Sequence, residues 1–558
     1  MTLAIEKEIS KVGTETVKVN GFYLHSKYNP LREAEQIAKQ EYKPHHLHIV
    51  FGYGLGYIVD ALIKEFHFNE PILLIDPLMD HNYIDVFNPT YNRFYSAKAN
   101  DIAKIIDMVD KLSTYSTNVH IITSINYDKL FPLELKNVLE IVKNNHYKQG
   151  SNIATAKHFA VAWQKNLLLN TNNILSDFTL GKLEKEYTAP VVIAAGGPSL
   201  TKQLSLLKEY RNKIILICAG STINALIANN IMPDYIVSVD GGEPNARHFE
   251  SLSFKKEVSL IYGPTNHYKV RDSFEGKGYA FIPSVKPKYK NYFENRFSKK
   301  LPLIHGGGSV AHYALSIAKY ITTGPIALIG QDLALTNDQS HATGVKCNKS
   351  AKDLPTSKKV LVEGYYGEMV TTTQTLKIMM NSFNEPPLLD TERKNVWNCT
   401  EGGAKIHSID QLPFGEFLEK FTNEEAPKIV GEVLDQSTHI EEEFFNTEIN
   451  NYNKILKLLK EGSQVINNSI GLKLTSYEVN KIGKIEKELN NLYKKYSLET
   501  LLEPIFDRCS HEYLPKVNET SVESNLRAKN YALDLYTSCY QQIEYFIEQL
   551  MSKENKTI

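Results

Sequence analysis

Residues suited to binding a phosphate follow an apolar segment near the middle of the chain. Val191–Ile193 predicts a strand, and Gly196, Gly197, Pro198 and Ser199 come between it and a segment of helical composition. Glycine lets the backbone turn sharply and come close to a ligand. Ser199 can cap the helix, and free N–H groups at a helix start favour an anion. An ordinary strand–turn–helix connection would use the same residue types.

Four more turns in the same region carry small or polar residues. They contain Ser221 and Thr222, then Asp240, then Gly308 and Ser309, and finally Gln331 and Asp332. In a parallel sheet the carboxyl ends of the strands meet at one edge, and ligands bind there. The five turns together therefore predict one pocket for a nucleotide-type ligand.

A proton-transfer reaction would need a base close to this pocket. His341 lies shortly after the last turn, in the run Ser-His-Ala-Thr-Gly, and an ordinary histidine accepts protons near neutral pH. A surface or hydrogen-bonding histidine is the alternative. Asp240 has no second carboxylate at Asp-x-Asp spacing, so no metal site is predicted, and a helix cap or a polar ligand contact is favoured for it. Glu401 either contacts the ligand or fixes a turn.

The segments between these turns predict the framework that positions them. Apolar segments over 191–193, 213–220, 234–240, 258–264 and 325–335 alternate with helical segments. That alternation predicts a mostly parallel, Rossmann-like sheet in a central domain over residues 155–420. A helix over 156–175 is expected to lead into it.

A second Rossmann-like domain is predicted over residues 1–150. Its elements are a strand at 48–51, a turn with Gly52, Gly54 and Gly56, a helix to Phe66, a strand at 72–76 and another at 119–125. One interpretation is a nucleotide or S-adenosylmethionine site with Asp76 on the ribose. The Gly-x-Gly-x-Gly spacing departs from the full dinucleotide pattern, so a purely structural turn is favoured.

The last region, residues 425–558, changes to long helices. Apolar residues step by three and four in three stripes, formed by Phe445, Ile449, Tyr452, Leu456 and Leu459, by Ile482, Ile485, Leu489, Leu492 and Tyr496, and by Leu533, Tyr536, Tyr540, Ile543, Ile547 and Leu550. Such stripes predict the core of an antiparallel helical bundle. Pro504 and Pro515 are expected in the connection before the last helix.

Composition excludes several classes of protein. The 558 residues carry a net charge of -1, without the basic excess that nucleic-acid binding requires. The five cysteines are scattered and odd in number, which favours reduced thiols. Neither a signal peptide nor an apolar run of about 18 residues is present, so we expect a cytoplasmic protein without a membrane span.

The ordered motifs resemble one family. The segments AAGGPSL, CAGSTINALIANNIMPDYIVSVDGG, GGGSVAHYALSIAKYITTGPIALIGQDLAL, HATG and NCTEGGAKI are similar to the central domain of the motility accessory factors (Maf), which are flagellin glycosyltransferases. The GYGLGY segment and the helical tail match the family's three-part layout. The central region is also similar, more distantly, to bacterial sialyltransferases, which hold a cytidine nucleotide on a GPSL turn.

The resemblance implies a reaction and its partners. It implies metal-independent, inverting transfer of a nonulosonic acid, such as pseudaminic or legionaminic acid, from a CMP-activated donor to Ser or Thr of flagellin. No cofactor beyond the donor is implied. The implied participants are therefore flagellin and the CMP-sugar, in bacterial flagellum assembly and motility.

The resemblance also implies roles for individual residues. Gly196, Gly197, Pro198 and Ser199 would hold the CMP phosphate and ribose, and Ser221 and Thr222 would lie beside the nucleotide. Gly308 and Ser309 would donate to the sugar carboxylate or the cytidine, and Gln331 and Asp332 would line the opposite wall. The predicted catalytic residues are Asp332 and His341, the latter chosen as the base from its position and not from the resemblance. No tyrosine lies between Asp332 and His341, where sialyltransferases carry phosphate-stabilising phenols. Tyr365, Tyr366 and His312 are the substitutes that this sequence offers.

Two other functions stay open at this point. Archaeal pterin diphosphokinases resemble the same central domain, and such an enzyme would use ATP and Mg²⁺. A non-catalytic flagellin-binding module would keep a vestigial pocket and act through the helical tail.

Overall fold

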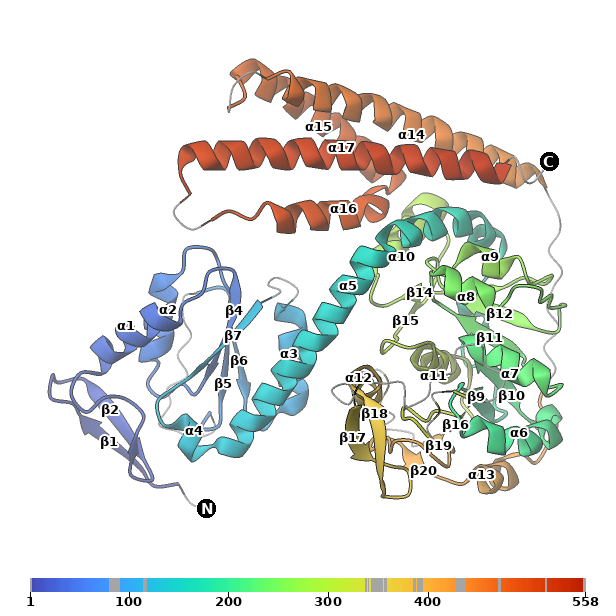
Figure 1. The fold of residues 1–558 in the computed structure, drawn as a ribbon, viewed down its shortest axis with the longest axis horizontal. Coiled ribbons are helices and arrows are strands. Elements are labelled where there is room, and N and C mark those ends of the chain that lie inside the picture. Colours follow the sequence, from blue (N-terminus) through green and yellow to red (C-terminus); the bar gives the residue numbers. More distant parts are fainter. Residues whose placement is uncertain are drawn as a thin grey trace. The chain divides into compact units, whose positions relative to one another are not determined.

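The computed structural model describes residues 3–79, 91–113, 118–336, 339, 341–342, 355, 359–384, 388, 395–427, 438–469, 473–516 and 519–554. The chain forms two compact units (Figure 1). Unit 1 comprises Met1–Ala156 with Lys516–Glu519, and unit 2 comprises Lys157–Pro515 with Thr520–Ile558. The three domain boundaries drawn from the sequence stay a prediction.

Unit 1 contains the predicted Rossmann-like sheet. The strands β4 (His46–Phe51), β5 (Ile72–Asp76), β6 (Phe94–Lys98) and β7 (Asn118–Thr123) are parallel, in the order β6-β5-β4-β7. The helices are α1 (Pro30–Glu41), α2 (Tyr57–Glu65), α3 (Ile102–Leu112) and α4 (Tyr127–Leu130). An antiparallel sheet of β1 (Ile5–Ile9), β2 (Glu15–Val19) and β3 (Phe22–Tyr23) was not predicted.

The glycine turn of unit 1 is packed by side chains of the same unit. A Cβ built on Gly52 would lie 2.4 Å from the ring of Tyr127, and one on Gly54 would lie 2.3 Å from His25. Asp76 is buried and accepts hydrogen bonds from the backbone N–H groups of Tyr53, at 2.7 Å, and Leu78, at 2.6 Å. The carboxylate that the alternative interpretation placed on a ribose therefore holds the turn itself, which fits the favoured structural interpretation.

Within the described residues, unit 2 is built on a nine-stranded sheet of order β20-β19-β16-β9-β10-β11-β12-β13-β8. Its strands are β8 (Phe178–Thr179), β9 (Val191–Ala194), β10 (Ile215–Ala219), β11 (Tyr235–Ser238), β12 (Ser259–Tyr262), β13 (Tyr279–Ala280), β16 (Ile326–Ile329), β19 (Val396–Asn398) and β20 (Asp410–Gln411). All its pairings are parallel, as predicted. The four outer strands have only two or three residues, too few to show a sequence pattern.

Helices cover both faces of this sheet. They are α6 (Leu200–Glu209), α7 (Ile223–Ala228), α8 (Glu243–Arg247), α9 (Tyr268–Arg271), α10 (Lys288–Phe297), α11 (Val310–Ile321), α12 (Gln374–Ser382) and α13 (Phe414–Phe421). Successive side chains of a strand point to opposite faces. Val192 therefore packs in one core cluster with α6, α7 and α13, and Val191 packs in the other with α11. Two short pairs, β14 (Ile282–Pro283) with β15 (Leu303–Ile304) and β17 (Lys359–Glu363) with β18 (Met369–Thr373), complete the strands.

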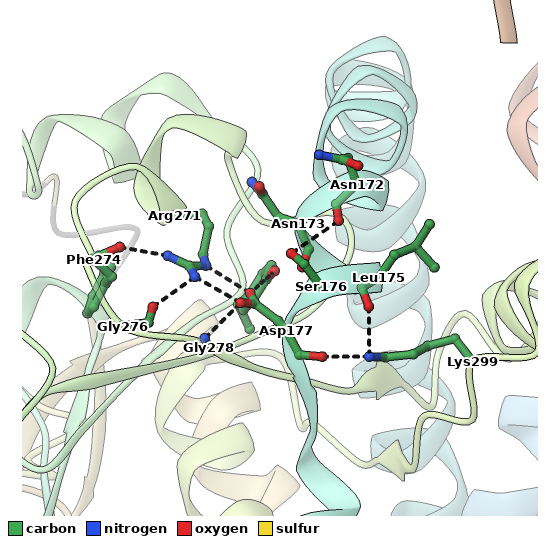
Figure 2. A network of polar contacts seen from close by, with 11 residues as sticks. Asn172, Asn173, Leu175, Ser176, Asp177, Arg271, Phe274, Gly276, Gly278 and Lys299 are labelled. Carbon is green, nitrogen blue, oxygen red and sulfur yellow. Dashed lines mark hydrogen bonds and ion pairs between the residues drawn. The ribbon is translucent and has the colours of Figure 1, made fainter. Parts of the chain in front are cut away.

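A buried ion pair marks the end of the helix that leads into unit 2. Helix α5 (Pro132–Ser176) begins in unit 1, ends in unit 2 and contains the helix predicted over 156–175. Directly after it, Asp177 receives two hydrogen bonds from Arg271, both 2.8 Å long, and one of 3.0 Å from Gly278 N (Figure 2). Tyr262 donates a further one, and Lys299 donates to the Asp177 carbonyl. This network ties the helix end to the sheet.

The predicted helical region is present and packs within unit 2. It consists of α14 (Thr438–Asn467), α15 (Ser476–Tyr496), α16 (Glu499–Glu512) and α17 (Ser521–Glu554). Ion pairs join α10 to these helices, between Arg296 and Glu448 and between Lys288 and Glu503. Pro504 lies inside α16 and not in a connection, so the helix lacks one intrahelical hydrogen bond there.

Most described residues of the three apolar stripes are buried as predicted, and the others are partly buried and pack against the same core, namely Leu456, Leu492, Tyr496, Leu533 and Tyr540. Tyr452, Ile482, Ile543 and Leu550 belong to the same core cluster as the sheet residue Val192. In the part of the chain that the structure describes, no helix is long and apolar enough to cross a membrane. The described cysteines are free and buried.

Candidate functional site

The register of the sheet aligns the turns that the sequence singled out. Ala194 of β9 pairs with Ile329 of β16 and with Cys218 of β10, and Ser238 of β11 pairs with Tyr262 of β12. The carboxyl ends of these strands therefore lie in a row. The turns after them share one edge, which we call the turn edge; it contains Gly196–Ser199, Gly220–Thr222, Asp240–Gly242, Gly263–Thr265 and Gly330–Asp332.

Two of these turns are locked together at their centre. Gly197 N donates to Gly330 O at 2.8 Å. Ser199 donates its N–H to Asp332 Oδ1 at 3.1 Å and its hydroxyl to Asp332 Oδ2 at 2.7 Å. Thr336 Oγ1 donates to the same Oδ2 at 2.6 Å. The structure thus brings Ser199 and Asp332 together, and joins them directly to each other.

The locked turns leave fewer free N–H groups than the sequence predicted. The N–H groups of Gly197 and Ser199 are both donated within the protein, and Leu200 N donates to Gly197 O at 3.1 Å. The expectation of free donors is therefore wrong for these residues, because acceptors 133 residues away in sequence bind the N–H groups of Gly197 and Ser199 and a local acceptor binds that of Leu200. Burial raises the pKa of the Asp332 carboxyl, and the hydrogen bonds from Thr336 and Ser199 oppose that rise in part.

A loop after β19 closes over the locked pair. A Cβ on Gly402 would lie 2.2 Å from Ser199 Oγ, and one on Gly403 would lie 2.2 Å from Asp332 O. Glu401 Oε2 accepts from Phe414 N at 3.1 Å, at the start of α13. Of the two roles left open for Glu401, fixing a turn is the one with contacts in the structure. The Thr-Glu-Gly-Gly motif was recognised in the sequence, but its packing on this pair was not.

A further turn that the sequence singled out, Gly306–Ser309, follows β15, which pairs with β14 outside the nine-stranded sheet. Gly308 has φ +90° and no atom within 4 Å of a built Cβ, so it is open. Ser309 precedes α11 and is partly exposed, and its hydroxyl contacts His312. A Cβ on Gly220 would lie 3.7 Å from Val310, so the turn that carries Ser221 and Thr222 is its neighbour. Ser221 is partly exposed, whereas Thr222 is buried.

Asp240 is the accessible carboxylate of the turn edge. Asp240 is exposed at the surface, yet the surrounding protein removes water from its carboxylate, and this desolvation raises the pKa of the carboxyl group. Its charge also contributes, after burial, to raising the pKa of Tyr313 in α11 to about 12. A carboxylate that is accessible and partly desolvated is suited to contact a ligand. No cap of α8 by Asp240 is seen, since Gly242 is the residue before that helix.

His341 reaches the same edge through the backbone. The next residue, Ala342, donates its N–H to Gly196 O at 2.9 Å. This contact places the backbone beside His341 next to the Gly196–Ser199 turn. The His341 side chain is partly exposed. Thr343 and Gly344 of the same motif lie outside the described residues.

Two tyrosines near the edge differ in exposure. Tyr365 is buried, and its hydroxyl donates to Asn398 O at 3.2 Å. Tyr366, between β17 and β18, is 69% exposed and donates to Glu401 O at 3.2 Å. Partial burial, with the charges of Glu401 and Glu368, raises its pKa, so the phenol stays a proton donor. Tyr366 is thus the accessible phenol of the two.

Buried polar atoms at the edge lack partners among the described residues. Gln331 Oε1 and Asn398 Nδ2 are of this kind, while Gln331 N donates to Thr400 Oγ1 at 3.1 Å. The sequence predicted Gln331 as a wall residue and did not predict Asn398. Across the described ranges, no group of three or more His, Cys, Asp and Glu residues could hold a metal ion.

Three comparisons bear on this fold. A family model described as 6-hydroxymethylpterin diphosphokinase MptE-like matches residues 165–338. An uncharacterized protein of Treponema pallidum (strain Nichols) is 35% identical over 69 residues, which are 12% of this chain and 23% of that protein. The chain therefore spans less than a quarter of that relative's length.

The third comparison covers almost the whole chain. The solved structure of a Maf glycosyltransferase from Magnetospirillum magneticum AMB-1 matches with a TM-score of 0.55 at 14% identity, over 99% of this chain and 95% of that one. The chain has the fold of that protein. The fold class predicted from the sequence, with two Rossmann-like sheets and a C-terminal helical region, is confirmed.

Proposed function

We propose that this chain, which shares its fold with a Maf glycosyltransferase over 99% of its length, is itself a glycosyltransferase of that family. The proposed reaction moves a nonulosonic acid from a CMP-activated donor to a Ser or Thr hydroxyl of flagellin, in the cytoplasm and without a metal or further cofactor. The match over the whole chain carries the proposal. The turn edge supports it, because it brings together the motifs on which the resemblance to the family was based.

The positions of the turns suggest a role for each of them in binding the donor. Asp332 and Ser199 hold two turns in register, so we assign them a positioning role at the floor of the donor site. The open Gly308 and the partly exposed Ser309 would receive the sugar carboxylate. Asp240 would contact sugar or ribose hydroxyls.

The acceptor hydroxyl must lose a proton, and the cytidylate must leave. His341 is the proposed base, because its backbone lies next to the Gly196–Ser199 turn. Tyr366 is the proposed donor to the departing phosphate, because its phenol is accessible and protonated and its hydroxyl hydrogen can turn from Glu401 O to the phosphate. Tyr366 would thus stabilise the phosphate, as tyrosines do in the sialyltransferases that the central region resembles.

The family model over residues 165–338 supports a second candidate, a pterin diphosphokinase-like enzyme that uses ATP and Mg²⁺. That model covers only residues 165–338 of unit 2, whereas the glycosyltransferase structure also matches unit 1 and the C-terminal helices. The transferase is therefore the better supported of the two.

Thermal unfolding with candidate ligands separates these functions. A ligand at 100 times its Kd stabilises the folded state by about 2.7 kcal/mol. We expect CMP and CMP-nonulosonic acids to raise the Tm, and ATP with Mg²⁺ or S-adenosylmethionine to leave it unchanged. A response to ATP with Mg²⁺ alone would overturn the proposal in favour of the kinase. No response to any nucleotide, with tight binding of flagellin, would indicate a non-catalytic module.

Transfer itself is measured by intact mass. Flagellin co-expressed with this chain and a nonulosonic acid pathway should gain the mass of one or more sugar residues. The His341→Ala variant should fold like the wild type and give unmodified flagellin. Full modification by that variant would remove His341 from the mechanism.

A further inference from the structure

The hydroxyl of Ser309 is joined to a buried histidine. Ser309 Oγ lies 2.7 Å from Nδ1 of His312, one turn further along α11. On the other side of the ring, His312 Nε2 lies 2.9 Å from the carbonyl oxygen of Met379 in α12. The ring has no exposed surface and packs on Phe383, with the two centroids 4.3 Å apart.

These contacts decide which nitrogen carries the hydrogen. A carbonyl oxygen only accepts, so Nε2 must donate to Met379 O. A neutral imidazole has one N–H group, and Nδ1 of His312 is therefore left with a lone pair. The Ser309 hydroxyl must then donate to Nδ1, at the 2.7 Å distance that the structure shows.

This direction limits what Ser309 can bind. With its hydrogen given to His312, Ser309 Oγ presents only lone pairs to a ligand and repels an anionic oxygen. The family resemblance implies that Gly308 and Ser309 donate to the sugar carboxylate or the cytidine. While His312 is neutral, the Ser309 hydroxyl cannot donate to either, because Met379 O of α12, 67 residues further along the chain, fixes the tautomer.

We propose that His312 is a positioning residue that couples binding of an anionic group at Ser309 to the uptake of one proton. The inference rests on the proposed function, in which the donor's carboxylate lies at Gly308 and Ser309. A proton from solvent reaches Nδ1 by way of the partly exposed hydroxyl. The new Nδ1–H then donates to Ser309 Oγ, and the hydroxyl hydrogen turns to the anionic oxygen. One proton is consumed, and only hydrogen bonds change.

Neighbouring charges set the pH at which this proton is bound. Among the described residues, the elements around His312 carry Lys319 on the same helix, Lys377 on α12, His305 after β15 and Asp240 after β11. Burial of the His312 ring opposes an imidazolium in the free protein, whereas a carboxylate bound at the Ser309 hydroxyl favours it. Proton uptake is therefore expected when the ligand arrives and not before.

Calorimetry measures this proton directly. Full-length protein is titrated with CMP-pseudaminic acid and CMP-legionaminic acid at pH 7.5, in two buffers with different ionisation enthalpies. The donor's phosphodiester does not titrate in this range, so a buffer-dependent heat reports proton uptake by the protein. We expect about one proton per donor bound, and a Kd that rises about tenfold per pH unit.

Matched variants locate the proton. His312→Gln and Ser309→Ala should bind more weakly, take up no proton and show no such pH dependence. Ser284→Ala is the control, because Ser284 Oγ lies 3.3 Å from Nδ1 of His305 in another Ser–His contact, and it should keep the full proton count. Wild-type binding without proton uptake, or uptake that persists in His312→Gln, overturns the inference.

A second measurement needs no variant. Nitrogen-15 NMR of histidine-labelled protein should show His312 neutral with its hydrogen on Nε2 when free, and charged when the donor is bound. A hydrogen on Nδ1, or a charged ring in the free protein, contradicts the coupling. If neither donor binds, the proposed function and this inference fail together, whereas binding without a proton removes the inference alone.

Discussion

Replacing Asp332 by asparagine tests whether this residue positions the turns or takes part in the chemistry. The wild-type carboxylate accepts the N–H and the hydroxyl of Ser199 and the hydroxyl of Thr336. The amide keeps the shape, and its oxygen can still accept from Ser199 N. Its NH₂ group replaces the oxygen that accepted both hydroxyls, and those hydroxyls must reverse and accept instead.

The magnitude follows from the number of bonds that change. Hydrogen bonds to a charged group contribute about 1.5–3 kcal/mol each, and neutral ones about 1 kcal/mol. Exchanging two charged bonds for neutral ones, with relief of a buried charge, gives a net loss of about 1–3 kcal/mol in the free energy of unfolding. Asp332→Ala leaves all three donors without this acceptor and should cost more, about 3–5 kcal/mol.

Urea denaturation measures these losses, and CMP binding and flagellin transfer are followed in parallel. We expect stability, CMP affinity and transfer to fall together in Asp332→Asn, because the residue acts through the Gly196–Ser199 turn. A variant as stable as the wild type, with unchanged CMP affinity and no transfer, would refute the positioning role. Asp332 would then belong to the reacting groups.

The difference in stability between the wild type and Asp332→Asn should depend on pH. The pKa of Asp332 is raised above its ordinary value of 3.8 in the folded state, mainly by burial. The folded state therefore binds this proton more tightly than the unfolded state. The tighter binding of this proton stabilises the folded state. Its contribution is fully present below pH 3.8 and is lost as the pH rises through the folded-state pKa of Asp332. The stability advantage of the wild type over Asp332→Asn should shrink across this window, and a constant difference in urea titrations would contradict the burial argument.

Four further substitutions test other features. Gly403→Ala should lower the free energy of unfolding in urea by about 2–4 kcal/mol, because Gly403 has φ +71° and a Cβ there would lie 2.2 Å from a backbone oxygen. Its control is Gly367→Ala, which has φ +92° but open space around the new Cβ and should cost about 1–2 kcal/mol. Equal losses in the two variants would contradict the argument from close approach. Arg271→Met leaves Asp177 buried without its guanidinium and should destabilise by about 3–5 kcal/mol, which a near-neutral unfolding curve would disprove. Tyr366→Phe should stay within about 0.5 kcal/mol of wild-type stability and lower transfer about 10- to 100-fold, and an unchanged rate would remove its phenol from the mechanism.

The central strands were predictable because each is a short apolar run followed by small residues. Val191–Ala194 and Ile326–Ile329 are buried on both faces of a parallel sheet, which demands such runs. Two-residue strands such as Tyr279–Ala280 carry no pattern of their own and form because a neighbouring strand offers backbone partners. The parallel order then followed from the alternation with helices.

The candidate site was predictable as a set of turns, but not in its hydrogen bonds. Ser199 and Asp332 were both singled out, yet 133 residues separate them, and no local spacing indicates that they bond to each other. The tautomer of His312 depends in the same way on a carbonyl in α12. Residue types and turns are local properties, whereas the direction of a hydrogen bond depends on which distant groups the fold brings together.

The core shared by the helical tail and the sheet has a consequence for how this chain can be altered. Tyr452 and Ile543 of the tail and Val192 of the sheet belong to one continuous apolar cluster. Removing the tail would therefore uncover the inner layer that supports the strands behind the turn edge. The tail cannot be exchanged or trimmed like a tethered accessory module, and in a shortened chain ending near residue 425 the sheet that carries the turn edge would lose this support.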